Sequence, residues 1–207
     1  MARPVDRDAK RLKILKAAAG RFGTVGYEAA SMDGVAAAAG VSKGSLYDYF
    51  QNKEDLFYAV FEWFEEHVLR LSMERMASAG GSARARFAAF ADASISAVMD
   101  NVELFPVSLE VWAAAAKRGT RARFSEALQK LYALFRTQVT ALLREAQASG
   151  EIKPDVDAEA VAALVVGAVD GLLLQYWIDP KIDPRRWMNN FVAALFDGIG
   201  SETKGSR

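Results

Sequence analysis

Four hydrogen-bond donors lie within seven residues near the N-terminus, at a spacing that suits one side of a short helix. They are Lys43, Ser45, Tyr47 and Tyr49. Leu46 and Phe50 are four residues apart and share the opposite side, which must therefore point into the protein. Gly44, on the outward side, allows the backbone to approach a ligand closely. Such a face can donate hydrogen bonds to phosphate oxygens and base edges of DNA, so the segment predicts a helix that enters the major groove.

One acidic residue, Asp48, lies near the centre of the same outward face. A carboxylate is repelled by phosphate, unless it accepts a hydrogen bond from the N4 amino group of a cytosine. The alternative is that Asp48 pairs with a neighbouring lysine or arginine and touches no base. The sequence leaves both interpretations open.

A helix-turn-helix would hold this face in place. Ser31 is expected to cap a first short helix, which ends at Gly40, where a left-handed residue is needed. Ser42 is expected to cap the second short helix, and Lys53 begins the next helix with a further phosphate contact. The second helix of such a motif lies in the major groove. The expected DNA-binding residues are Ser31, Ser42, Lys43, Gly44, Ser45, Tyr47, Asp48, Tyr49 and Lys53.

The segment GVSKGSLYDYFQNKEDL, preceded by RFGTVGYEAAS, resembles the N-terminal domain of TetR-family transcriptional regulators over about residues 8–60. The resemblance implies an all-helical homodimer with a DNA-binding head over residues 1–52 and a ligand-binding and dimerisation body over residues 53–207. It also implies that an inducer bound in the body releases the protein from DNA. The chain departs from the family at Asp48, which is more often uncharged or basic, and at Gly34. An acidic residue usually completes a capping box at the position of Gly34. Because glycine also disfavours the helical conformation, we expect the first short helix to have low stability.

Composition limits the classes of function. The 207 residues include no cysteine and one histidine, so thiol chemistry, disulfides and most metal sites are not expected. No nucleophile–base pair and no phosphate-binding loop is visible in the sequence, and we predict no enzyme, no catalytic residue, no metal and no cofactor. Residues 1–53 hold nine lysines and arginines against five acidic residues, whereas the whole chain has no net charge, so the head is basic and the body acidic. The polar N-terminus lacks a secretory signal pattern, which favours a cytoplasmic protein.

Helical periodicity extends over the rest of the chain, without strand alternation, and predicts an all-α fold of about nine helices. Besides the two short helices, the expected ranges are about 8–25, 53–79, 83–101, 102–117, 120–149 and 157–178, with a last helix that is capped at residue 183. Glycines at 119 and 150 and a proline at 154 punctuate this pattern.

The helix expected over residues 157–178 is apolar nearly all round. A membrane span needs about 20 apolar residues in succession, and Asp170 and Gln175 interrupt this helix, so no membrane partner is expected. We expect it to form a four-helix dimer interface with the last helix and their symmetry mates, and core packing within a monomer is the alternative. The expected interface residues are Val161, Val165, Leu172, Phe191 and Leu195.

Aromatic residues gather in the middle of the body, which suits a helical bundle around an apolar cavity. The expected ligand contacts, each of which has ordinary core or surface packing as its alternative, are Phe64, His67, Phe90, Trp112, Phe135 and Asp170. We therefore predict a ligand-responsive regulator, and most simply a repressor, that binds a palindromic operator as a homodimer and is released by a small apolar or aromatic effector. The alternative is a helical small-molecule carrier or an enzyme without DNA function. The sequence does not separate a repressor from an activator.

Overall fold

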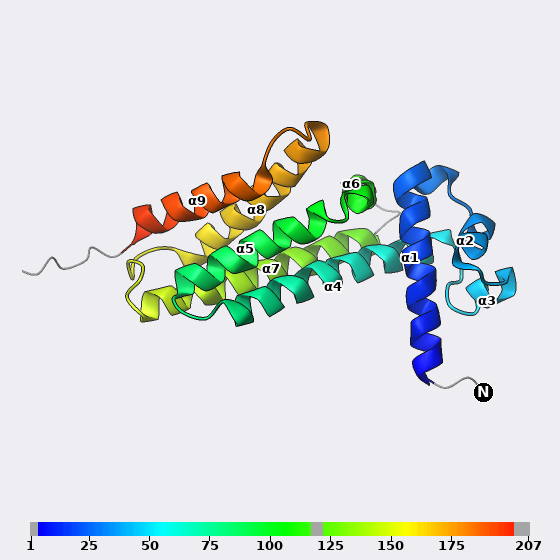
Figure 1. Ribbon diagram of the computed structural model, residues 1–207, viewed down its shortest axis with the longest axis horizontal. Coiled ribbons are helices and arrows are strands. Elements are labelled where there is room, and N and C mark those ends of the chain that lie inside the picture. Colours follow the sequence, from blue (N-terminus) through cyan, green and yellow to red (C-terminus); the bar gives the residue numbers. More distant parts are fainter. Residues whose placement is uncertain (1–3, 117–121, 201–207) are drawn as a thin grey trace, which may run out of the picture. The chain divides into compact units, whose positions relative to one another are not determined.

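The computed structural model describes residues 4–116 and 122–200, and within them the chain is almost entirely helical (Figure 1). The elements are α1 (Pro4–Ala29), α2 (Met32–Ala39), α3 (Lys43–Tyr47), α4 (Lys53–Ala79), α5 (Ala83–Met99), the 3₁₀ helix η1 (Val102–Leu104), α6 (Phe105–Ala116), α7 (Ala122–Ala148), α8 (Ala158–Ile178) and α9 (Pro184–Ile199). A single isolated bridge between Ile152 and Gly200 is the only β pairing in the described part of the chain. The prediction of an all-α fold with about nine helices is confirmed over the described residues.

Most helix boundaries follow from local signals. The α4 helix spans the predicted residues and ends at Gly80 and Gly81, both with positive φ, and Pro184 begins α9 behind the capping side chain of Asp183. The α1 helix runs beyond its predicted end, but its geometry is broken at Gly26 (φ 77°, ψ 168°).

The helix predicted over residues 102–117 is divided. Asn101 leaves the helical region (φ −130°, ψ 37°), and the N–H of Leu104 donates to its carbonyl in a tighter 3₁₀ turn before α6 begins at Phe105. Pro106 lies in the first turn of α6, where its missing N–H costs nothing. The predicted boundaries at residues 117 and 119–120 lie outside the described residues.

The chain divides into two compact units, one formed by Met1–Glu66 with Asn101–Leu128 and the other by His67–Asp100 with Gln129–Arg207. We call them unit 1 and unit 2. The α4 and α7 helices each contribute residues to both units. The functional division into residues 1–52 and 53–207 stays a prediction.

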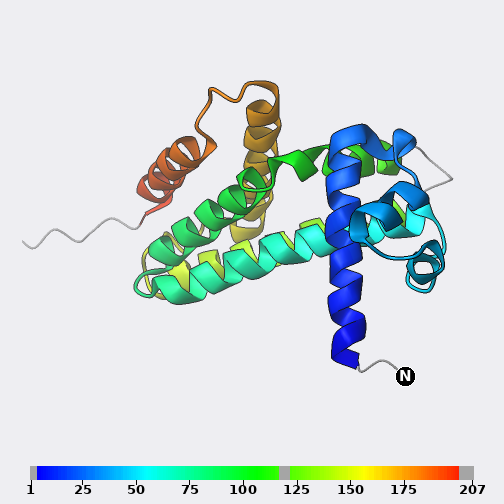
Figure 2. The same cartoon turned by 45° about the vertical axis from the view of Figure 1, so that its right-hand side comes forward.

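Unit 1 is built around α1, which packs against α2, η1 and α6 (Figure 2). Its buried face includes Ile14, Leu15 and Phe22, and the Phe22 ring meets the Phe57 ring of α4 edge to face, with the ring centroids 5.0 Å apart. Leu46 of α3 is fully buried in the same unit. The helix-turn-helix is therefore anchored on the apolar side of α1.

The packing of α1 on η1 depends on a glycine. A Cβ atom placed on Gly23 would lie 2.2 Å from the carbonyl oxygen of Glu103, far inside van der Waals contact. Only glycine permits this approach of a helix to the backbone of η1.

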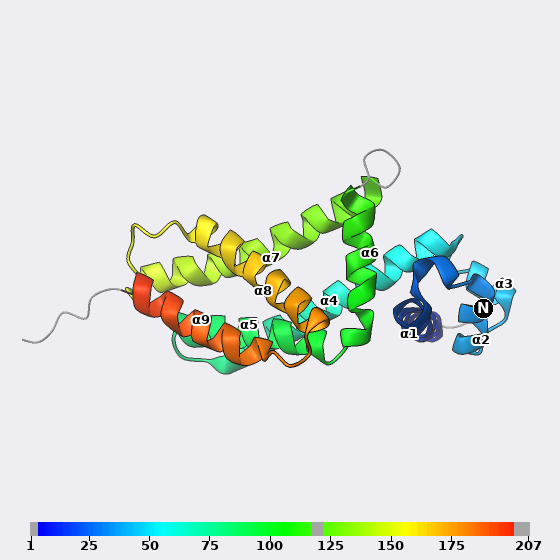
Figure 3. The same ribbon diagram turned by 90° about the horizontal axis from the view of Figure 1, so that it is seen from above.

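In unit 2, α5 packs against α8 and α9, and α8 also packs against α9 (Figure 3). The rings of Phe87 and Phe196 meet with their centroids 5.3 Å apart. The Arg185 guanidinium donates to both carboxylate oxygens of Asp92, over 2.9 and 3.0 Å, and ties the start of α9 to α5.

Candidate functional site

The turn between α2 and α3 has the geometry of a helix-turn-helix. The N–H of Gly34 donates to Oγ of Ser31 (3.1 Å), and the N–H of Ser45 donates to Oγ of Ser42 (3.2 Å), so both predicted N-caps are confirmed. Gly40 adopts the left-handed conformation (φ 59°, ψ 41°), and its N–H returns to carbonyls of α2. These local interactions fix the entry of the chain into α3.

The two faces of α3 are as predicted. Leu46 and Phe50 are buried, whereas Lys43, Gly44 and Asp48 are exposed. The helix itself is shorter than expected and ends at Tyr47, but the N–H groups of residues 48–50 still donate to carbonyls of residues 44 and 46, so the outward face continues past its end.

The donors on this face differ in exposure. Tyr47 is 44% exposed, while Ser45 and Tyr49 are half-buried. The Tyr49 ring packs beside Phe50, and the Arg7 guanidinium lies 5.8 Å from its centroid. A second arginine of α1, Arg11, lies 5.6 Å from the Phe50 ring. The N-terminal half of α1 therefore lies beside the residues that follow α3, which the sequence interpretation missed because these contacts join residues some 40 positions apart.

Asp48 has no ion-pair partner among the described residues. The alternative that it pairs with a neighbouring cation is therefore not seen in the free protein. Contact with a cytosine stays a prediction.

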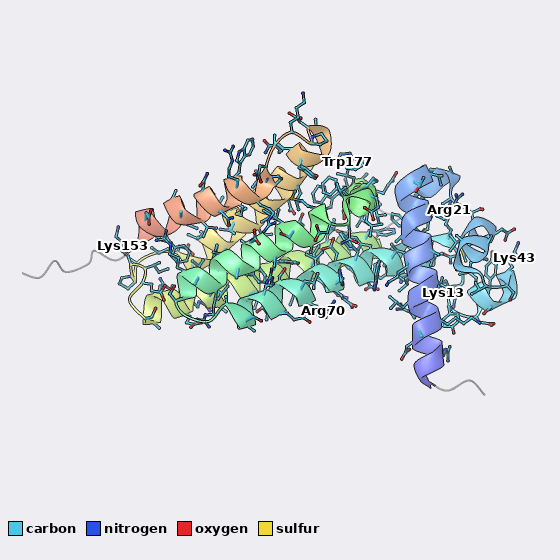
Figure 4. The ribbon with its side chains drawn as sticks, viewed as in Figure 1. Lys13, Arg21, Lys43, Arg70, Lys153 and Trp177 are labelled. Carbon is cyan, nitrogen blue, oxygen red and sulfur yellow. The ribbon has the colours of Figure 1, made fainter. Side chains whose placement is uncertain are left out.

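The cation on the recognition helix, Lys43, is paired instead. Its Nζ atom lies 2.8 Å from Oδ1 of Asp33 in the first turn of α2, and the hydrogen bond from the ammonium to this carboxylate raises the pKa of Lys43. Figure 4 shows the Lys43 side chain on the α2–α3 side of unit 1, away from α1. The pair was not predicted, since its partners are ten residues apart across the turn.

Lys53 has a structural role that was not foreseen. Its Nζ atom donates to the carbonyl oxygens of Tyr27 (2.8 Å) and Glu28 (3.0 Å), and it lies 4.5 Å from the centroid of the Tyr27 ring. The ammonium thus donates to carbonyls at the irregular end of α1, in addition to the predicted phosphate contact. One N–H remains for phosphate, and that contact stays a prediction.

The side chain of Arg21 occupies the space beside Gly34. The Arg21 guanidinium lies over Gly34, with Nη2 and Nε 3.6 and 3.7 Å from the place of a Cβ atom. The buried Nε atom of Arg21 has no hydrogen-bond partner in the described part of the chain. An acidic side chain at position 34, as the family pattern has, would contact this guanidinium. With glycine at this position, the Arg21 Nε atom lacks such a partner.

A second cluster in unit 1 joins α4 to α7. Nη1 of Arg123 donates to Oδ1 of Asp55 (2.7 Å), and its guanidinium lies 3.6 Å from the centroid of the Tyr58 ring. The hydrogen bond from Arg123 lowers the pKa of Asp55, while burial raises the pKa of the Tyr58 hydroxyl. The Asp55 N–H donates to Oδ1 of Asn52 (2.8 Å), so the same residue also fixes the start of α4 behind the recognition helix.

The predicted ligand contacts are divided between the units. Phe64 and Trp112 belong to unit 1, where Trp112 meets the Phe105 ring edge to face. The remaining four, His67, Phe90, Phe135 and Asp170, belong to unit 2.

Two contacts in unit 2 concern these residues. The rings of Phe90 and Phe135 have their centroids 6.0 Å apart. The Tyr132 hydroxyl donates to Oδ2 of Asp170 over 2.8 Å, and burial raises the pKa of this carboxyl group. The structure thus brings Phe90 and Phe135 together, and it adds Tyr132, which the sequence did not single out.

An apolar cavity of about 320 Å³ lies in unit 1 between α1, α4 and α6. Its walls include Phe22, Tyr27, Phe57 and Leu109, and Glu110 also lines it. None of the predicted ligand contacts lines it. No cluster of three or more potential metal ligands occurs among the described residues.

Four of the five predicted interface residues are at least partly exposed, and Val165 is the exception. Val161, Leu172 and Leu195 are half-buried and Phe191 is exposed, so each has surface left for a partner. Val165 is only 3% exposed, because it packs within unit 2, and it has no side-chain surface to offer.

Further exposed apolar residues, outside the five predicted interface residues, lie on the same helices. They are Leu164, Leu174, Trp177, Ile178 and Trp187. By length and composition α8 is apolar enough to cross a membrane, and it is the one such helix in the described ranges. The same properties fit a helix that a second protein covers.

Known proteins resemble the chain over both parts. Residues 14–60 match bacterial regulatory proteins of the tetR family, and residues 83–201 match the C-terminal domain of BetI-type transcriptional repressors. The chain is 28% identical over 169 residues to the uncharacterised HTH-type transcriptional regulator YhgD of Bacillus subtilis (strain 168), with 82% of this chain and 84% of YhgD covered. It is 25% identical over 199 residues to the fatty acid metabolism regulator protein of the same organism, with 92% and 95% covered. The crystal structure of a TetR-family transcriptional regulator from Cytophaga hutchinsonii shares the fold, with a TM-score of 0.78, 20% identity and 98% and 100% of the two chains covered.

Proposed function

Because the chain belongs to the TetR family of bacterial regulatory proteins, we propose that this DNA-binding transcriptional regulator is a repressor that a small molecule releases from its operator. The outward face of α3 carries the proposal, since Tyr47, Ser45 and Lys43 present donors beside the buried pair of Leu46 and Phe50. The repressor role is supported by the match of residues 83–201 to BetI-type repressors. A DNA-binding role supports a cytoplasmic location, and we propose no catalytic role and no membrane partner.

The proposed regulator is a homodimer. Leu164 and Ile178 of α8 are 72% and 74% exposed, and Trp187 and Phe191 of α9 are also exposed. Large apolar side chains exposed on two helices that pack together are typical of a protein interface. A two-fold dimer would cover it with the same surface of its partner and would place two recognition helices on a palindromic operator, one or more DNA turns apart.

The proposed effector is a small apolar or aromatic molecule that binds among the aromatic residues of the body. Phe90 and Phe135 would supply apolar contacts, and the Tyr132–Asp170 pair would supply a polar one. The α4 helix runs without interruption from residue 53, directly behind the helix-turn-helix, into unit 2. An effector that favours one position of α4 over another would change the spacing of the recognition helices and weaken operator binding.

Selection of bound sequences from randomised DNA tests the proposal. We expect a palindromic site, a dimer by light scattering, and a linear fall of log affinity with log salt concentration that reflects several phosphate contacts. A protein that enriches no sequence, and whose DNA affinity does not depend on salt, would instead be a small-molecule carrier or another non-DNA protein.

A further inference from the structure

The helix-turn-helix segment carries an unusual charge balance for a surface that binds DNA. Between residues 31 and 50 the sequence holds two acids, Asp33 and Asp48, and one cation, Lys43. The six cations between residues 7 and 21 all belong to α1. General attraction to phosphate therefore comes from α1, while the recognition segment itself is negatively charged.

The single cation of the segment is in contact with one of its acids. Nζ of Lys43 lies 2.8 Å from Oδ1 and 3.0 Å from Oδ2 of Asp33, with the two side chains 62% and 65% exposed. The carboxylate thus presents two oxygens to the ammonium, as a phosphate group does. An ammonium has three N–H donors, and the hydrogen bond to Asp33 occupies at least one of them.

The Lys43–Asp33 ion pair is exposed, so a DNA phosphate can compete with Asp33 for the ammonium. An exposed ion pair is weak, so a phosphate group can displace the carboxylate, but the displaced Asp33 then lies beside that phosphate. Binding to DNA of arbitrary sequence relies almost wholly on phosphate contacts. Its affinity is therefore lowered most when Asp33 competes with phosphate for Lys43. Binding to an operator also draws on base contacts by the rest of the outward face, and it can proceed with the pair intact.

We propose that Asp33 is a specificity-determining residue, which holds the Lys43 ammonium and so suppresses binding to DNA of arbitrary sequence more than binding to the operator. This inference rests on the proposed DNA-binding function. It assigns the discrimination to a residue that is not itself a base contact.

The test compares Asp33→Asn with the parent protein on two duplexes, a selected operator and a random sequence, over a range of salt concentrations. We expect affinity for the random duplex to rise at least about five-fold at low salt, with a salt slope steeper by about 0.9 for each head, as for one added phosphate contact. Affinity for the operator should change by less than about two-fold in the same series. In the double variant with Lys43→Met, the gain on random DNA should disappear.

Three controls make the outcome interpretable. Asp155→Asn removes an exposed acid outside the helix-turn-helix and should leave both affinities unchanged. Thermal unfolding followed by circular dichroism reports whether Asp33→Asn has weakened α2, and Asp33→Ser then serves as the second variant. Equal gains on both duplexes, an unchanged salt slope, or a gain that survives Lys43→Met would each overturn the inference. Failure of the parent protein to bind any duplex would instead defeat the proposed function.

Discussion

Replacement of Lys53 by alanine separates a structural role from a role in DNA binding. The ammonium donates to two backbone carbonyls, of Tyr27 and Glu28, and lies over the Tyr27 ring. A hydrogen bond to a charged group contributes about 1.5–3 kcal/mol, but one of these two is exposed and the freed carbonyls regain water. We therefore expect Lys53→Ala to lower the free energy of unfolding by about 2 kcal/mol, including a small term from the ring contact.

For a chain of this size, about 2 kcal/mol corresponds to a fall of roughly 4–8 °C in the midpoint of thermal unfolding. Circular dichroism at 222 nm measures it. The matched control is Tyr47→Ala, whose side chain is 44% exposed on the outward face of α3. This control should shift the midpoint by no more than about 2 °C, since exposed substitutions stay within about 0.5 kcal/mol, but it should weaken operator binding.

The second measurement is the salt dependence of DNA affinity. If the remaining N–H of Lys53 reaches a phosphate, Lys53→Ala lowers the slope by about 0.9 for each head. An unchanged midpoint would refute the role of Lys53 at the end of α1. An unchanged slope together with a lowered midpoint would refute the phosphate contact and leave a purely structural lysine.

Four further predictions concern assembly, packing and base contact. Phe191→Arg should yield a monomer by light scattering and abolish operator binding, because a charge would be buried unpaired at the interface, and an intact dimer would remove Phe191 from it. Gly23→Ala should lower the free energy of unfolding by about 1–3 kcal/mol through overpacking on η1, whereas Gly20→Ala, with no atom within 4 Å of its new Cβ, should raise it by about 1 kcal/mol. Gly34→Ala should stabilise by less than Gly20→Ala, since its Cβ lies 3.2 Å from the capping Ser31 hydroxyl, and thermal melts of the three glycine variants check this order. Asp48→Asn should move one position of the selected site from cytosine toward adenine, a change of about 1–3 kcal/mol in discrimination, and an unaltered site profile would exclude the base contact.

Local rules predicted the parts of the fold that depend on neighbours in sequence. The caps at Ser31 and Ser42, the left-handed Gly40 and the end of α4 at Gly80 each need only a side chain and the backbone within a few residues. The inward direction of Leu46 follows from helical geometry alone. These are the features that the sequence determines before tertiary packing acts.

Contacts between distant residues could not be predicted in the same way. Lys53 donates to the carbonyls of Tyr27 and Glu28 in the last turn of α1, 26 and 25 residues earlier, where a helix leaves carbonyls without intrahelical partners. The close approach of Gly23 to Glu103 joins parts of the chain 80 residues apart, and its sequence signal is one glycine among 15. A pattern of residue types contains the partners of such contacts but does not say which of them meet.

The exposed side of α8 could not be predicted for a different reason. Periodicity reveals the buried face of a helix only when another face is polar, and α8 is apolar nearly all round. Leu164 and Val165 are adjacent and equally apolar, yet the first is 72% exposed and the second 3%. Packing against α5 and α9 decides between them.

The distribution of charge suggests how the two tasks of the head are divided. Arg7, Arg11 and Lys13 are exposed on α1, and Arg7 and Arg11 lie near the rings of Tyr49 and Phe50, just past the end of α3. Phosphate contacts from α1 would supply affinity for any duplex and set the orientation of α3, since such contacts carry no sequence information. The α2–α3 segment, with one paired cation and two acids, would add little general attraction and would act mainly on base edges. Substitutions in α1 should accordingly weaken all DNA binding alike, whereas substitutions in α3 should change which sequences are bound.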